Sequence, residues 1–235
     1  MELSNRLYAI AKMVSKHSKV ADIGCDHGYL SIYLAKEKQC ERVIAMDVNH
    51  GPLDRAQKNI QRYGLDQTIQ TRLSDGAKAL HANEVNTLIC AGMGGLLMKK
   101  ILADVDLNYL GIEQLILQPQ SQAQILRLFL REIGFAIIDE DALFEDHKYY
   151  QIIHARRMNT IINDGSHLDD YFGPVLLQTK NPVLLTYLHQ ELAKIEAIAL
   201  RMQQDGIPMS DQEIAQKQSR ITNALEFMQR DRNEM

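Results

Sequence analysis

Between Lys19 and Arg157, short apolar segments alternate with amphipathic ones. The apolar segments predict strands near residues 19–24, 43–48, 69–73, 87–91, 114–118, 135–142 and 149–156. The amphipathic segments predict helices over residues 28–38, 52–63, 76–81, 94–104 and 121–133. Strands that alternate with helices form a sheet covered by those helices. The sequence therefore predicts an α/β fold in which helices cover both faces of a seven-stranded, Rossmann-like sheet.

The last two predicted strands differ from the others in how they are connected. Only residues 144–148 separate them, which is too short for the crossover that parallel neighbours require. We therefore expect an antiparallel pair at the end of the sheet. A dinucleotide-binding Rossmann sheet ends in a sixth parallel strand instead.

The sequence after Arg157 shows helical rather than strand periodicity. Asn181-Pro182 predicts a helix start, and apolar residues recur at intervals of three and four over residues 184–202 and 214–228. Gly206 and Pro208 interrupt this pattern, and Ser210 to Glu213 form a capping-box sequence. We expect two domains, a sheet domain over residues 1–158 and a helical, coiled-coil-like hairpin over residues 159–235.

Composition narrows the class of protein. The three cysteines are widely spaced and odd in number, which favours free thiols and predicts no metal site. No apolar run is long enough to span a bilayer and no secretory signal is evident, so we expect a cytoplasmic protein with no membrane contact. The net charge of −4 argues against nucleic acid covering the whole surface, but leaves a local basic patch open.

The turn after the first predicted strand carries an acidic residue and two glycines, Asp22, Gly24 and Gly28. A dinucleotide fingerprint that starts at Gly24 requires glycine at the positions of Asp26 and Tyr29, so that interpretation fails. The pattern is similar to the glycine-rich loop of S-adenosylmethionine-dependent methyltransferases, where carboxylates and carbonyls suit an ammonium group and a sulfonium. The alternative is a tight turn that serves packing alone.

Two further carboxylates are expected at successive strand ends. Asp47 could accept hydrogen bonds from both ribose hydroxyls of an adenosine. Asp75 could accept from the adenine amino group, and Gly76 would let the backbone approach the ring. A single strand-end aspartate is more often a helix cap, but three in the expected order favour a cofactor site.

The fourth predicted strand leads into a glycine-rich stretch, Ala91 to Gly95. The Asn- or Asp-Pro-Pro-aromatic motif that many amino-group methyltransferases carry here is absent. Gly92 and Met93 are assigned to the cofactor and Gly94 to the substrate, because backbone amides at a helix N-terminus can bind acceptor atoms. A turn required only for packing is the alternative.

Together, these segments resemble one family. Asp22 to Tyr29, Ala91 to Gly95, Leu117 to Pro119 and the helical tail look like the bacterial tRNA (adenine-22 N1)-methyltransferases, the TrmK-like class I enzymes. The likeness spans nearly the whole chain, with Gln120 where asparagine is expected. It implies a methyl transfer from S-adenosylmethionine to N1 of an adenine in the D arm of tRNA, with the tail as a tRNA contact.

Adenine N1 carries an in-plane lone pair, so methyl transfer requires orientation more than a general base. Asp26 is the first candidate for stabilising the positive charge that develops, and His27 and Tyr29 are candidates for positioning or stacking the base. Local hydrogen bonding of His27 and helix packing of Tyr29 are the alternatives.

Binding of tRNA also requires cations. The substrate-binding candidates are Arg6 and Arg127, and further surface candidates are Lys12, Lys16, Arg131, Arg156 and Arg157. Two other functions stay open, a methyltransferase of a small molecule or protein and a non-catalytic RNA-binding or assembly module. The oligomeric state is open as well, a monomer included.

Overall fold

The computed structural model describes residues 2–158, 167–204 and 212–230. The chain divides into two compact units, residues 1–163 and 164–235.

Unit 1 is built on a seven-stranded sheet in the order β3-β2-β1-β4-β5-β7-β6. Its strands are β1 (Lys19–Ile23), β2 (Arg42–Asp47), β3 (Ile69–Leu73), β4 (Thr87–Gly94), β5 (Gln114–Ser121), β6 (Phe135–Glu145) and β7 (Lys148–Arg157). The first five strands are parallel, and β7 pairs antiparallel with both β5 and β6. The predicted α/β class and the terminal antiparallel pair are confirmed.

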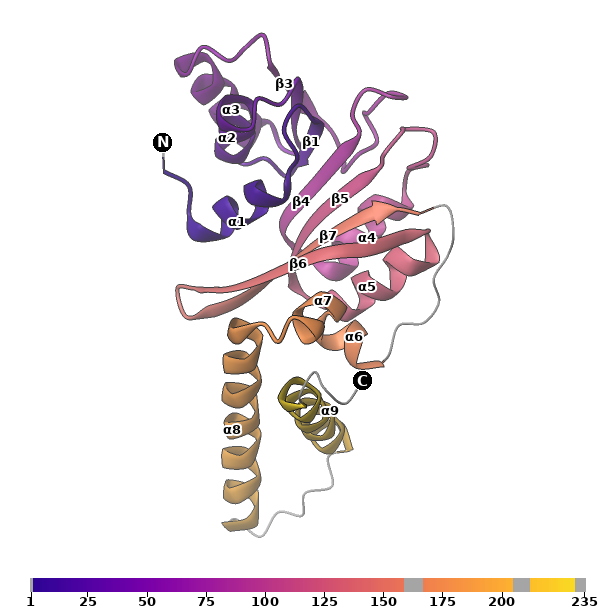
Figure 1. Ribbon diagram of the computed structural model, residues 1–235. Coiled ribbons are helices and arrows are strands. Elements are labelled where there is room, and N and C mark those ends of the chain that lie inside the picture. The colour runs from indigo at the N-terminus through magenta and orange to yellow at the C-terminus, as the bar shows by residue number, and fades with distance from the viewer. Residues whose placement is uncertain (1, 159–166, 205–211, 231–235) are drawn as a thin grey trace. The chain divides into compact units, whose positions relative to one another are not determined.

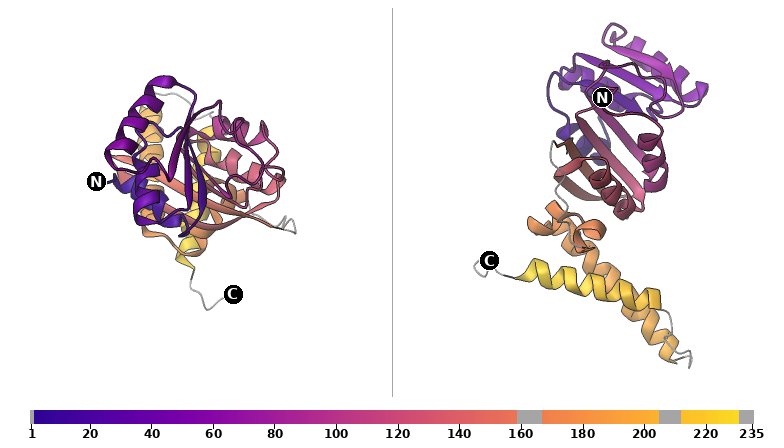
Figure 2. Two further views of the ribbon diagram at one scale, coloured as in Figure 1. Left: turned by 90° about the horizontal axis from the view of Figure 1, so that it is seen from above. Right: turned by 90° about the vertical axis from the view of Figure 1, so that its right-hand side faces the viewer.

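Helices cover both faces of this sheet, as Figures 1 and 2 show. The helices of unit 1 are α1 (Asn5–Met13), α2 (Tyr29–Glu37), α3 (His50–Arg62), α4 (Gly95–Ala103) and α5 (Ala123–Glu132). Alternate strand residues point to opposite faces. Thus Leu88 and Cys90 join a core with α4 and α5, whereas Ile89 between them joins a core with α1, α2 and α3.

One predicted helix does not form. Residues 76–79 form turns and residues 80–81 have no regular structure, and the chain passes from β3 to β4 through an irregular loop over residues 74–86, all described. Gly76 has a φ of +60°, which is outside the helical region. Ser74 Oγ donates to the Gly76 carbonyl and accepts from the Ala79 amide. This side chain therefore satisfies backbone groups that a helix would have bonded internally.

Two other boundaries also differ from expectation. Strand β4 continues through the predicted glycine turn to Gly94, with register shifts at Met93, because Gly92 at a φ of +75° permits a bulge. The link between β6 and β7 is only Asp146-His147, both at positive φ, a two-residue hairpin turn. Helix α1 ends at Met13, so Lys12 lies in its last turn and Lys16 lies beyond it.

Unit 2 is helical in its described residues. It contains α6 (His167–Phe172), α7 (Pro174–Gln178), α8 (Pro182–Gln204) and α9 (Gln212–Gln229). The predicted apolar stripe is buried at Leu184, Leu188, Ile195, Ile221, Leu225 and Met228. The helical character of the C-terminal region is therefore confirmed.

The start of α8 follows the predicted signal, because Asn181 Oδ1 accepts the amides of Val183 and Leu184 at 2.9 and 3.1 Å. Glu191 on α8 accepts from Lys217 on α9 at 2.6 Å, which links the two helices. The predicted break at Gly206 and Pro208 and the start of the capping box at Ser210 lie outside the described residues.

Candidate active site

A pocket of about 290 Å³ lies at the carboxyl ends of β1 and β4, beside α1. This edge is where ligands bind in open α/β sheets. The pocket brings together the β1 turn and the β4 glycines, which the sequence places far apart. Its lining comprises Arg6, Leu7, Asp22, Gly24, Cys25, Asp26, His27, Tyr29, Leu30, Ala91, Gly92 and Gln120.

Asp22 is a buried carboxyl group in this pocket. Its side chain is 3% exposed and accepts a hydrogen bond of 2.7 Å from Ser31 Oγ. Burial raises the pKa of Asp22 to about 6, and the nearby Asp47 carboxylate raises it further. A carboxylate buried in this way is stabilised by a cationic group placed beside it, so the site suits a cationic ligand group.

Arg6 gives the same pocket a positive side. Its Nη1 donates to the Oε1 atom of the buried Gln118 at 2.8 Å, and its guanidinium lies 5.7 Å from the centre of the Tyr150 ring. Gln118 Oε1 also accepts from the Gly92 amide at 3.1 Å, so one side chain holds both α1 and the β4 bulge. The pocket can therefore accommodate an anionic group and a cationic group at once.

The glycine loop leaves room that side chains would fill. Gly24 and Gly28 have φ values of +76° and +73°, which favour glycine. A Cβ atom on Gly24 would lie 2.3 Å from the Met93 methyl group, and one on Gly28 would lie 3.0 Å from Ala56 Cβ. This tight cradle, with the buried Asp22 beneath it, fits the amino-acid end of S-adenosylmethionine.

Asp26, His27 and Tyr29 form the rim of the pocket. Asp26 has a φ of +48° and lies 3.5 Å from Arg55 Nη2 and 3.7 Å from His27 Nε2. The His27 and Tyr29 rings are stacked, with centroids 5.7 Å apart and planes 12° apart. Asn59 Nδ2 donates to the His27 carbonyl at 2.9 Å, which fixes the loop against α3. An exposed carboxylate thus lies beside an exposed aromatic stack.

Asp47 and Asp75 lie at the ends of β2 and β3, outside the lining of the pocket as described. Asp47 Oδ1 accepts from the Asn49 amide at 2.9 Å. Asp75 is exposed and pairs with Lys78 Nζ at 2.5 Å, and this ammonium holds the pKa of Asp75 below its usual range. Adenine binding by Asp75 would therefore compete with this ion pair, which involves the Oδ2 atom.

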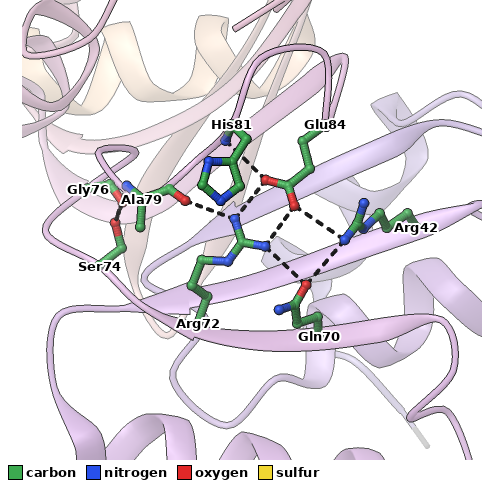
Figure 3. A network of polar contacts seen from close by, with 8 residues as sticks. All are labelled: Arg42, Gln70, Arg72, Ser74, Gly76, Ala79, His81 and Glu84. Carbon is green, nitrogen blue, oxygen red and sulfur yellow. Dashed lines mark hydrogen bonds and ion pairs between the residues drawn. The ribbon is translucent and has the colours of Figure 1, made fainter.

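A polar network holds the loop that carries Asp75, as Figure 3 shows. The Arg72 guanidinium binds both carboxylate oxygens of Glu84 at 2.7 Å and donates to the Ala79 carbonyl at 2.9 Å. Glu84 also accepts from the His81 amide at 3.1 Å and lies 3.2 Å from Arg42. These contacts join the end of β3 to residues 79, 81 and 84, so side chains hold this loop in place although it contains no helix.

Gly95 has a packing role. A Cβ atom there would lie 2.5 Å from the Gln122 carbonyl oxygen and 2.8 Å from that of Ser121. The start of α4 therefore abuts the turn between β5 and α5. Gly94 has more room, because a Cβ atom there would lie 3.3 Å from Ser121 Oγ.

The assignment of Arg127 to the substrate is corrected by the structure. Its side chain is 1% exposed, its Nε lies 2.9 Å from Glu140 Oε1, and its Nη2 donates to Gln151. Arg127 sits on the inner side of an amphipathic helix, where charge alone in the sequence does not reveal a buried partner. It ties α5 to the β6–β7 hairpin and does not reach the surface.

Some relevant groups were not singled out from the sequence. Gln118 is fully buried, and Val48 and Leu73 are exposed at 60% and 45% beside Asp47 and Asp75. In the sequence, an apolar residue that directly follows a strand-end aspartate, as Val48 follows Asp47, could have indicated apolar surface beside the site. Cys25, Cys40 and Cys90 are free and buried, and burial raises the pKa of each thiol.

Two further features concern the described residues alone. The described residues contain no group of three or more His, Cys, Asp or Glu side chains arranged to hold a metal ion. None of the described helices combines the length and apolar character of a membrane span.

Comparison with known proteins gives matches along most of the chain. A family model for a methyltransferase domain matches residues 3–153. A tRNA (adenine(22)-N(1))-methyltransferase of Bacillus subtilis is 34% identical over 201 residues, which cover 84% of each chain.

Solved structures agree with this match. A Streptococcus pneumoniae protein in complex with S-adenosyl-L-methionine has a TM-score of 0.82 and 33% identity, covering 95% of this chain and 100% of that one. M. capricolum TrmK, solved with S-adenosyl-homocysteine, has a TM-score of 0.81 and 27% identity, covering 97% and 98%. The chain belongs to the family of the tRNA (adenine-22 N1)-methyltransferases, with the class I methyltransferase fold.

Proposed function

We propose that this chain transfers a methyl group from S-adenosylmethionine to N1 of adenine 22 in the D arm of tRNA. The observation that carries the proposal is the pocket in which Arg6 and the buried Asp22 face the same cradle of glycines. Family membership supports the reaction, and this charge arrangement supports the cofactor.

The two charged sides of the pocket match the amino-acid end of the cofactor. Asp22 would attract the ammonium group, and Arg6, already oriented by Gln118, would pair with the carboxylate. Arg6, which the sequence suggested as a tRNA-binding residue, is thus proposed to bind the cofactor instead. Gly24, Gly28 and Gly92 would allow the backbone to approach it closely.

The adenosine end would lie over the ends of β2 and β3. Asp47 would accept from the ribose hydroxyls, and Val48 and Leu73 would provide apolar surface for the adenine ring. Asp75 and Gly76 would contact the adenine edge once Lys78 releases the Asp75 carboxylate. Met93, whose methyl group approaches Gly24, would pack against the cofactor between its two ends.

When bound, S-adenosylmethionine supplies the methyl group on a sulfonium centre. The residues of this chain would orient the target base, with His27 and Tyr29 offering their stacked faces at the rim. Asp26 would stabilise the positive charge that the base acquires. Arg55 would have to leave Asp26 for this, because a paired carboxylate stabilises a second cation less. Gly94 would face the substrate.

The helical unit is the proposed second contact with tRNA. Arg201 on α8 and Arg230 after α9 are exposed cations that could bind phosphates. A cytoplasmic location follows from a tRNA substrate and belongs to the same proposal.

The proposal is tested with unmodified tRNA and labelled S-adenosylmethionine, followed by nucleoside analysis. We expect 1-methyladenosine in a tRNA with adenine at position 22 and none when guanine replaces it. Label in a protein or small molecule, with none in tRNA, would overturn the proposed substrate. Loss of cofactor binding altogether would instead favour a non-catalytic RNA-binding module.

A further inference from the structure

Two consecutive leucines are exposed at the start of α4. Leu96 and Leu97 are 51% and 50% exposed, although they lie in the first turn of a helix whose larger apolar residues further along, Met98, Ile101 and Leu102, are buried. The first turn lies directly after Gly92, which lines the pocket, and after Gly94 at the end of β4. The leucines therefore stand beside the pocket, on the β4 side.

The helix that carries the pair is anchored in the core. Met98 and Leu102, on the inner side of α4, are 0% and 1% exposed in the core below the sheet. Gly95 lies so close to the backbone of Gln122 that even a Cβ atom would not fit. The start of α4 is therefore packed tightly against the turn between β5 and α5. The exposed apolar surface of the two leucines costs free energy in water.

The proposed reaction gives such surface a use. An adenine within a helical arm of RNA has its N1 inside the duplex, so the base must leave the stack before it reaches the pocket. A vacated stack loses favourable contacts, and proteins that unstack bases commonly insert apolar side chains into the gap. An apolar pair beside the pocket is suited to that position.

We propose that Leu96 and Leu97 form a wedge that enters the RNA stack and replaces the extruded adenine. This inference rests on the proposed function. The extruded base would lie between the wedge on the β4 side and the His27–Tyr29 stack on the β1 side.

Two observations favour RNA as the occupant of this apolar surface. Leu96 and Leu97 follow Gly92, a residue of the pocket lining, by only four and five positions, so a base in the pocket would leave its neighbours in the stack close to the start of α4. Lys100, one turn further along α4, is exposed and supplies a cation for the adjacent phosphate.

The first experiment measures extrusion without catalysis. The target adenine is replaced by 2-aminopurine, whose fluorescence rises when the base leaves the stack, and the full-length protein is added at saturating concentration. We expect the wild type to raise the fluorescence and the Leu96→Ala/Leu97→Ala variant to raise it at least fivefold less. Leu128→Ala, which removes a leucine 42% exposed on α5, is the matched control and should behave as the wild type.

The second experiment compares two substrates. The variant should lose at least tenfold in kcat/KM on intact tRNA, but less than twofold on tRNA with an abasic site opposite the target adenine. The abasic tRNA has already lost the pair that holds the base, so a wedge is no longer needed. Leu96→Met/Leu97→Met, which keeps the apolar volume, should restore activity on intact tRNA.

Each outcome decides the matter. Equal losses on both tRNAs, or unchanged fluorescence enhancement in the variant, would overturn the wedge. A change in sedimentation mass on mutation would show that the leucines join two copies, and would overturn it as well. If the wild type methylates neither tRNA, the proposed function fails; if it methylates both and the variant equals it, only the wedge fails.

Discussion

Ser31 Oγ donates a hydrogen bond of 2.7 Å to Asp22 Oδ2, and both side chains are buried. One hydroxyl does not replace the water that a carboxylate loses on burial, and the pKa of Asp22 accordingly rises to about 6. The fold thus holds a carboxyl group that is costly to ionise at the place where the cofactor's ammonium group is proposed to bind.

Asp22→Asn should therefore stabilise the protein and weaken its cofactor binding together. Burial raises the pKa of Asp22 from 3.8 to about 6. Below pH 4 this carboxyl group is protonated in both the folded and the unfolded state and costs no stability, whereas its ionisation in the folded state destabilises the protein as pH rises through 6. The variant should gain up to about 3 kcal/mol at pH 7.5 and nothing below pH 4. Urea denaturation across this range measures the gain.

The same variant tests the ammonium assignment. Calorimetry at pH 7.5 should show S-adenosylmethionine affinity reduced more than tenfold, and wild-type affinity should fall as pH drops below 6 while that of the variant stays flat. Undiminished affinity in the variant would contradict the role of Asp22.

Asp47→Ala or Asp75→Ala should each weaken S-adenosylmethionine binding more than tenfold, because each removes a proposed acceptor for the adenosine half. Lys78→Ala is the useful comparison. It frees the Asp75 carboxylate from the ion pair at 2.5 Å and should leave the affinity equal or higher. If calorimetry finds the S-adenosylmethionine affinity of both aspartate variants unchanged, the adenosine half does not bind at the ends of β2 and β3.

The sheet was predictable because its signals are local. A link too short for a crossover forces β6 and β7 to pair antiparallel, and short apolar runs mark the central strands. The loop over residues 74–86 was not predictable, because its conformation depends on Arg72 and Glu84, which meet only in the folded protein. Local propensity carries no information on that pairing.

The site shows the same division. The turn from Asp22 to Gly28 could be identified because its backbone needs glycine at two positions with positive φ. The orientation of Arg6 by Gln118, and the burial of Arg127 by Glu140, join segments far apart in sequence. Charge alone therefore could not tell a cation of the pocket from a cation of the core.

Arg127→Ala should destabilise the protein by about 3 to 5 kcal/mol, because it removes the buried guanidinium that compensates the charge of the buried Glu140 carboxylate. Replacing both partners, as Arg127→Met/Glu140→Leu, should recover most of that loss. Below the melting temperature, tRNA affinity of the double variant should equal that of the wild type in filter binding. A loss of tRNA affinity without a loss of stability would indicate that Arg127 contributes to substrate binding after all.

Glu84→Gln should reduce stability in a pH-dependent manner. The Arg72 guanidinium lowers the pKa of Glu84 to about 2 from 4.5, so its stabilising contribution is present above pH 4.5 and is lost as pH falls towards 2. The Tm difference between wild type and variant should be greatest above pH 5 and shrink below it. Arg42→Gln, at the edge of the network, should show a smaller difference.

Gly95→Ala should impair catalysis more than it impairs cofactor binding. The added Cβ atom would meet the backbone of Ser121 and Gln122 at 2.5 to 2.9 Å, and backbone cannot rotate away as a side chain can. The start of α4 must then shift, and with it Leu96 and Leu97 on the substrate side. We expect kcat/KM for tRNA to fall at least tenfold, with S-adenosylmethionine affinity within threefold of the wild type.

Gly51→Ala provides the matched control for this change, since Gly51 also lies in the first turn of a helix. A Cβ atom there meets only the end of the Arg55 side chain at 3.8 Å, so the substitution should be neutral or stabilise α3 by up to about 1 kcal/mol. Equal activity of the two variants would show that the contact at Gly95 relaxes without moving α4. A greater loss of kcat/KM in Gly95→Ala would show that methylation of the RNA depends on the tight contact between α4 and the β5–α5 turn.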